Sequence, residues 1–155
     1  MKITSIILMF IFGLVTVIFF PIGFIYLNNY YSFPILTNIF LKPLGLIFIL
    51  LGGGIDLHCI YLFFQKGKGT PVPIDPPKKL VIKDIYKYSR NPMYIVLMLI
   101  ILGEFLFFGH LLLLFYLLLI FLSVNLMVIF YEEPTLKKKF GKNYLEYYKK
   151  TPRWL

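Results

Sequence analysis

Polar side chains stand at the ends of two neighbouring apolar segments in the C-terminal half of the chain. Arg90, Asn91 and Pro92 open the first segment, and Glu132 and Glu133 close the second. If the segments form two antiparallel helices, these ends meet at the same membrane face. A cation and two carboxylates at the edge of a bilayer suit a small zwitterion. The adjoining lipid phase would accommodate an apolar second substrate.

The start of the first segment has the pattern of a helix N-terminus. Asn91 is a favoured N-cap residue, and Pro92 suits the first helical position. The free amides of Met93 and Tyr94 would then favour an anion. A well-capped helix beside an interfacial arginine is the simpler interpretation. Charges at helix ends argue for more, because Arg90 at an N-terminus and glutamates at a C-terminus both oppose the helix dipole. This double reversal indicates mutual pairing or a ligand.

Composition indicates an integral membrane protein. The 155 residues are 59% hydrophobic and have a mean hydropathy of +0.82, which is typical of transmembrane helices. The single cysteine excludes an internal disulfide, and one Cys with two His lacks the spacing of a metal site, so no metal is expected. The net charge is +9, but its basic residues flank apolar segments, which predicts membrane contact and no nucleic acid.

The pattern predicts an all-α integral membrane fold with four transmembrane helices, a C-terminal helical hairpin and a cytoplasmic interfacial tail. We expect one membrane domain, 1–155, with a two-helix part at 1–64 and the loop, hairpin and tail at 65–155. The expected segments are Ile3–Leu27, Pro43–Phe64, Pro92–Phe108 and Leu111–Tyr131. The first segment lacks an A-x-A-like cleavage site, so we expect it to be retained.

Basic residues predict the orientation. With four crossings, fifteen of the sixteen Lys and Arg residues fall on one face, and only Lys42 lies on the other. The positive-inside rule makes the basic face cytoplasmic, so both termini are expected there.

Secondary features add further expectations. Gly67–Pro77 is rich in Gly and Pro and should be extended. Lys78–Ser89 is amphipathic and is expected against the membrane surface, and Pro134–Leu155 should form a short interfacial helix. Asp56 and His58 are ionisable residues within a membrane segment and are therefore candidates for a function. His110 is expected in a turn. Close helix contact is expected at the glycines Gly52, Gly53, Gly54 and Gly103.

Several short motifs occur in a specific order. They are K-K-L-V at Lys78–Val81, Tyr86, R-N-P-M-Y at Arg90–Tyr94, E-E at Glu132–Glu133, F-G-K-N-Y at Phe140–Tyr144 and T-P-R-W at Thr151–Trp154. Together they resemble the integral-membrane methyltransferases that include isoprenylcysteine carboxyl methyltransferase and phosphatidylethanolamine N-methyltransferase. The resemblance covers Gly69–Leu155 and lies in the order and spacing of the motifs.

The resemblance implies S-adenosylmethionine as cofactor and methyl transfer to a lipophilic or membrane-embedded carboxylate or amine. It implies cofactor contacts at Lys78, Lys79, Leu80, Val81, Tyr86, Asn91, Pro92, Met93, Tyr94 and Glu132. Arg90 and Glu133 are the predicted catalytic residues, with Glu133 as the base if the acceptor is an amine. Expected partners are a lipid or lipidated acceptor and membrane lipids, with no obligate protein partner.

Two positions depart from the family pattern. Members acting on prenylcysteine carry an arginine one turn before the glutamates, where this chain has Val128. This predicts an acceptor without a free carboxylate. Asp84 stands where the family usually has glycine, which predicts an altered loop before Tyr86.

Two other functions remain compatible with the residues. A membrane sterol-type reductase using a nicotinamide cofactor would share an R-H-x-x-Y element and a K-Y-G tail, but such enzymes carry a basic and acidic cluster where this chain has Tyr131, Glu132 and Glu133. A scaffold or assembly protein would use Arg90 and the glutamates as a structural bridge. Binding of S-adenosylmethionine, of a nicotinamide nucleotide or of neither separates the three.

Overall fold

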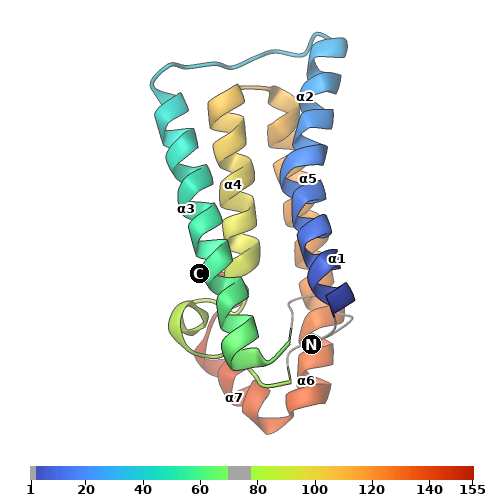
Figure 1. Cartoon of the computed structure of the whole chain (residues 1–155), viewed down its shortest axis with the longest axis vertical. Coiled ribbons are helices and arrows are strands. Elements are labelled where there is room, and N and C mark those ends of the chain that lie inside the picture. Colours follow the sequence, from blue (N-terminus) through green and yellow to red (C-terminus); the bar gives the residue numbers. More distant parts are fainter. Residues whose placement is uncertain (1–2, 70–77) are drawn as a thin grey trace.

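The computed structural model describes residues 3–69 and 78–155, and its regular elements are helices (Figure 1). In chain order they are α1 (Ile3–Leu14), η1 (Val15–Phe19), α2 (Phe20–Tyr30), α3 (Leu41–Leu62), η2 (Phe63–Gly67), η3 (Asp84–Lys87), α4 (Pro92–Phe108), α5 (Leu111–Met127), η4 (Val128–Glu132), α6 (Glu133–Phe140) and α7 (Lys142–Lys150). Here η1, η2 and η4 are π-helical turns that continue the neighbouring α-helices, and η3 is a 3₁₀ turn. The predicted extended stretch Gly67–Pro77 lies largely outside the described residues.

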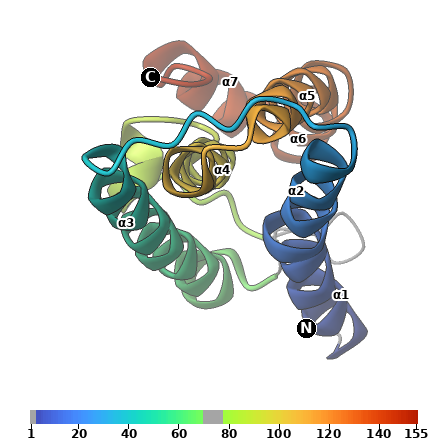
Figure 2. The same ribbon diagram turned by 90° about the horizontal axis from the view of Figure 1, so that it is seen from above.

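Three continuous helices in the described part of the chain are long and apolar enough to cross a membrane: Ile3–Tyr30, Leu41–Gly67 and Leu111–Phe140. The fourth apolar helix, α4, has 17 residues, or about 25 Å at 1.5 Å per residue. The all-α membrane fold predicted from the sequence is therefore confirmed. Seen along the bundle, α3, α4, α5 and the α1–α2 helix form an arc (Figure 2).

The second helix of the hairpin is longer than expected. It was predicted to end at Tyr131, but the π-helical turn η4 leads directly into α6, so Glu132 and Glu133 lie inside a helix. Pro134 lacks an amide hydrogen, and the wider turn before it accommodates the proline without ending the helix. The two glutamates therefore do not stand at a helix C-terminus, and the predicted conflict with the helix dipole was wrong for them.

A loop and a glycine turn close one end of the bundle, which we call the hairpin end. Gly109 has a φ of 76°, a left-handed conformation that glycine adopts freely, and it ends α4. Its carbonyl accepts a hydrogen bond of 2.7 Å from the Leu36 amide, so the loop after α2 lies across the turn. His110, the expected turn residue, follows and contacts the Asn29 side chain at 3.1 Å.

Small residues bring α3 and α4 together. A Cβ at Gly45 would lie 2.6 Å from the Gly103 carbonyl oxygen, and one at Gly52 would lie 2.6 Å from Ile100. The expectation for Gly52 and Gly103 thus agrees with the packing, and Gly45 joins them. Gly53 and Gly54 face open space, so the expectation was wrong for them.

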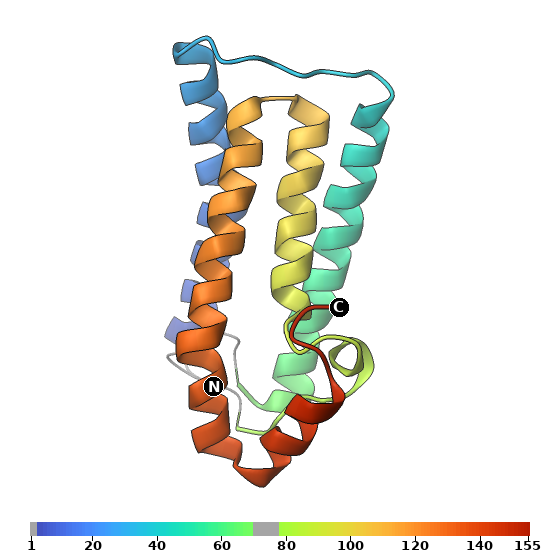
Figure 3. The ribbon, with the colours of Figure 1, turned by 180° about the vertical axis from the view of Figure 1, so that it is seen from behind.

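The opposite end of the bundle, which we call the site end, holds the start of α4 together with α6 and α7 (Figure 3). The helix Leu111–Phe140 is about 45 Å long, which exceeds the roughly 30 Å of a bilayer's hydrocarbon core. Its final turns, with Glu132 and Glu133, can therefore extend beyond the hydrocarbon beside the short α4.

Candidate functional site

The segment before α4 is held by the C-terminal residues. The Arg90 amide donates to the Pro152 carbonyl at 3.0 Å, and the Ser89 hydroxyl donates to the Arg153 carbonyl at 3.2 Å. Asn91 stands at the predicted N-cap position, but its side chain donates to the Arg153 carbonyl at 3.0 Å and makes no cap hydrogen bond. The side-chain capping role predicted for Asn91 was therefore wrong, and the residue anchors the tail.

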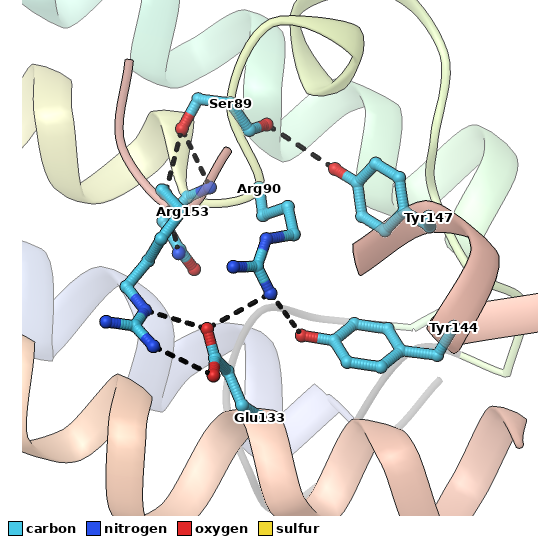
Figure 4. A network of polar contacts seen from close by, with 7 residues as sticks. Ser89, Arg90, Glu133, Tyr144, Tyr147 and Arg153 are labelled. Carbon is cyan, nitrogen blue, oxygen red and sulfur yellow. Dashed lines mark hydrogen bonds and ion pairs between the residues drawn. The ribbon is translucent and has the colours of Figure 1, made fainter. Parts of the chain in front are cut away.

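Arg90 projects from this segment into the interior of the site end (Figure 4). Its side chain is 7% exposed, and Nη1 lies 3.0 Å from Glu133 Oε1 and 3.3 Å from the Tyr144 hydroxyl. The guanidinium carbon also lies 4.0 Å from the centre of the Tyr148 ring, a cation–π distance. Its Nε is buried without a hydrogen-bond partner among the described residues. Arg90 therefore keeps one buried donor for a further acceptor.

Glu133 joins two arginines. Arg153 donates to its two carboxylate oxygens, from Nε at 2.8 Å and from Nη2 at 3.1 Å, while Arg90 approaches Oε1 (Figure 4). Two guanidinium groups share one carboxylate, so the three side chains carry a net charge of +1. Arg153 was missed as a site residue, although T-P-R-W at Thr151–Trp154 was among the motifs that carried the resemblance.

Glu132 has a different partner. One of its oxygens accepts a hydrogen bond from the Tyr94 hydroxyl, which comes from the first turns of α4. Glu132 forms no ion pair within the described part of the chain, so its charge is not matched by a neighbouring cation.

Two tyrosines connect α7 with the loop before α4. The Tyr147 hydroxyl donates to the Tyr86 carbonyl at 2.7 Å, and burial raises the pKa of Tyr147, which keeps the hydroxyl a neutral donor. Tyr86 packs in a buried cluster with Cys59, Leu62 and Val81. Its hydroxyl is buried with no oxygen or nitrogen partner in the described chain, beside the Cys59 thiol. Val81 and Tyr86 therefore turn inward to the site, and the position of Lys78–Ser89 against the membrane surface stays a prediction.

These elements enclose a cavity of about 60 Å³. Of the predicted site residues, Leu80, Val81, Tyr86, Arg90, Asn91, Glu132 and Glu133 line it, together with Phe63, Leu136, Tyr144 and Tyr147. The other five lie elsewhere. The exposed Lys78 and Lys79 donate their backbone amides to Gly67, Pro92 and Met93 pack at the start of α4, and Tyr94 reaches the site through Glu132.

A second, apolar groove of about 860 Å³ runs between α4 and α5. It is lined by Phe33, Ile95, Met98, Leu99, Leu102, Leu111, Leu112, Leu114, Phe115, Leu117, Leu118 and Phe121. Ile95, in the first turns of α4, is the groove residue nearest in the chain to Arg90 and Asn91, which line the smaller cavity. The Trp154 ring lies 6.5 Å from the Phe121 ring, which places the C-terminal tail beside the groove.

Comparison with known protein families bears on the function of this site. Residues 41–143 match the model of the phospholipid methyltransferase family. The chain belongs to this family. The predicted resemblance is therefore confirmed, and the protein is a membrane methyltransferase by family. Neither the curated proteins nor the solved structures gave a match.

The family match covers only part of the site. It covers α3 to the start of α7 and includes Arg90, Asn91, Glu132 and Glu133. Tyr144, Tyr147 and Arg153 lie beyond it, although they complete the polar network around Arg90. The intramembrane candidates Asp56 and His58 line neither the 60 Å³ cavity nor the groove in this family member.

Proposed function

We propose that this chain transfers a methyl group from S-adenosylmethionine to a lipophilic acceptor that lies in the membrane. One observation carries the proposal: this phospholipid methyltransferase family member has a small cavity lined by Arg90, Asn91, Glu132 and Glu133, and an apolar groove between α4 and α5. The polar cavity suits a charged cofactor, and the groove suits a hydrocarbon chain.

The residues around the cavity fit the charges of the cofactor. Its amino-acid end carries both a carboxylate and an ammonium, and the site offers the unpartnered Nε of Arg90 and the unmatched carboxylate of Glu132. The rings of Tyr86, Tyr144 and Tyr147 would surround its sulfonium, because aromatic faces attract cations. When bound, the cofactor supplies an activated methyl group, so the protein mainly aligns the two reactants and excludes water.

The cavity must enlarge to admit this cofactor. Its volume of about 60 Å³ is the space of about two water molecules, whereas small-molecule sites typically measure about 300–1,000 Å³. Binding therefore requires movement of an enclosing element. We expect the segment Leu80–Val81 to move and enlarge the cavity, because the flanking residues Lys79 and Ile82 are exposed.

The geometry favours a positioning role for Glu133. Its carboxylate contacts two arginines, which stabilise its anionic form and weaken it as a proton acceptor. Its predicted role as a base stays a prediction. Glu132 accepts a hydrogen bond from one neutral hydroxyl, and its proposed ligand is the cofactor's ammonium.

The acceptor without a free carboxylate, which Val128 predicted, stays a prediction. Val128 is fully buried and lines neither cavity, so its replacement of the family arginine says little about the acceptor. Arg153 supplies a cation near the site from the tail. An acceptor that carries an anionic group is compatible with this arrangement.

A cofactor-binding experiment tests the proposal. Glu132→Gln should weaken binding of S-adenosylmethionine to the purified protein by roughly 10- to 150-fold, because it removes a charge-assisted contact of about 1.5–3 kcal/mol. Isothermal titration calorimetry in detergent measures this affinity, and Glu146→Gln, an exposed acid on α7, is the matched control. Equal affinity in wild type and Glu132→Gln would contradict the proposed site. Binding of a nicotinamide nucleotide in its place would contradict the function.

A further inference from the structure

We propose that Arg153 binds the oxyanion of the lipid acceptor, a phosphodiester or a carboxylate, while the acceptor's hydrocarbon chain lies in the groove between α4 and α5. The inference rests on the proposed function and extends it, because it names the chemical group that the acceptor must carry. In the cluster of Arg90, Glu133 and Arg153, two positive side chains share one negative side chain.

The cluster carries one positive charge in excess, and Arg153 is the member that can offer it. The Arg90 side chain is 7% exposed and points inward to the cavity, whereas the Arg153 side chain is 29% exposed. Arg153 uses Nε and Nη2 for Glu133, and its Nη1 has no partner among the described residues. A partly exposed guanidinium with a free donor is a suitable receptor for phosphate or carboxylate oxygens.

Arg153 is also joined to the groove through its neighbour in the chain. Trp154 contacts the ring of Phe121, which lines the groove. An arginine followed by a tryptophan beside an apolar surface matches the membrane interface, where an aromatic ring lies at headgroup level. A lipid with its chain in the groove would thus place an anionic headgroup beside Arg153.

The arrangement separates the two anions that the reaction would bring to the site. The cofactor's carboxylate would take the buried Arg90, and the acceptor's oxyanion would take Arg153 on the exposed side. Glu133 lies between the two guanidinium groups and fixes both, so neither arginine needs to serve two ligands. The tail therefore supplies the cation that the sequence of the hairpin lacks.

The single tryptophan of the chain provides a direct test. The full-length protein in a nonionic detergent is titrated with three lipids whose chains are brominated: phosphatidylethanolamine, stearic acid and diacylglycerol. Bromine quenches tryptophan fluorescence on contact, so loss of Trp154 emission reports binding in the groove. The first two lipids carry a phosphodiester and a carboxylate, and the third carries no anion.

We expect at least one of the two lipids that carry an oxyanion to quench Trp154 at a concentration about tenfold or more below that of diacylglycerol, the usual effect of a charged hydrogen bond. Arg153→Gln should abolish this preference, and Arg153→Lys should keep most of it. Lys138→Gln, which removes an exposed charge from α6, should leave it unchanged. The anionic lipid that binds more tightly identifies the source of the oxyanion.

Three outcomes would overturn the inference: equal quenching by all three lipids, an unchanged preference in Arg153→Gln, or loss of quenching by diacylglycerol together with the anionic lipids in that variant. The last would show that the arginine only attaches the tail. No methyl donor is present, so the result is independent of cofactor binding. If calorimetry showed no cofactor binding at the proposed cavity, Arg153 and the groove would still be a lipid-binding site by this test.

Discussion

Asp84 illustrates how one residue shapes the loop that carries Tyr86. Its φ is 58°, a left-handed conformation, and its carboxylate pairs with Lys66 at the end of the helix Leu41–Gly67. Glycine adopts this conformation freely, and aspartate tolerates it better than most residues, so Asp84 can occupy this position, and the altered loop before Tyr86 stays a prediction.

A substitution series at Asp84 separates backbone strain from the ion pair. Asp84→Val should lower the unfolding midpoint in detergent by about 2–6 °C, because a β-branched residue is strained at positive φ. Asp84→Gly should stay close to wild type, since it relieves the strain while losing an exposed pair. Lys66→Gln is the control that removes only the pair. A midpoint for Asp84→Val equal to wild type would contradict the strain argument.

At the residue scale, the sequence could predict which charges meet but could not predict all their partners. Arg90, Glu132 and Glu133 flank the same hairpin, and its antiparallel geometry alone brings them to one cavity. Arg153 and Tyr144 come from a tail whose path depends on backbone hydrogen bonds to Arg90 and on side-chain contacts. The spacing of apolar residues along the sequence predicts helices and strands, but it does not predict the path of such a tail.

At the element scale, the limits of α4 agreed with the prediction because Pro92 and Gly109 mark them. The end of the next helix was misplaced because the apolar run stops at Tyr131, whereas a π-helical turn carries the helix on through Glu132 and leaves no clear sequence signal. The sequence indicated that glycines allow close helix packing, but it did not show which side of α3 each glycine faces. Gly45 was therefore missed and Gly53 was included.

Packing of α3 on α4 should depend on two glycines that face each other. Gly45→Ala and Gly103→Ala each place a methyl group less than 3 Å from the facing helix backbone, at 2.6 and 2.7 Å from a carbonyl oxygen. Overpacking of this kind costs about 1–3 kcal/mol, and we expect each variant to lower the free energy of unfolding by that amount. Equilibrium unfolding in mixed detergent micelles measures it.

Gly53→Ala and Gly54→Ala are matched controls on the same helix, because a Cβ at either position meets no atom within 4 Å. Both should leave stability unchanged or raise it slightly, since alanine favours helix more than glycine does. Equal destabilisation by Gly45→Ala and Gly53→Ala would show that the two helices do not pack closely.

At the scale of the whole molecule, the site draws almost entirely on residues after 62, and the N-terminal helix Ile3–Tyr30 contributes no lining residue to the polar cavity. That helix packs on α5 instead, where Thr16 accepts a hydrogen bond of 2.7 Å from the Tyr116 hydroxyl. The division at 64/65 remains a prediction, and this arrangement is compatible with it.

The topology of the chain gives the final prediction. Fifteen of the sixteen basic residues fall on one side only if all four apolar helices cross the membrane, including the 17-residue α4. Single cysteines at Lys68 and Lys138 should then react with a membrane-impermeant maleimide from the same side, and one at Asn38 should react from the other. The native Cys59 is buried, and a Cys59→Ser background removes its residual signal. Reaction of the Lys68 and Lys138 sites from opposite sides would show that one of the four helices does not cross the membrane. The prediction that both basic regions are cytoplasmic would then be wrong.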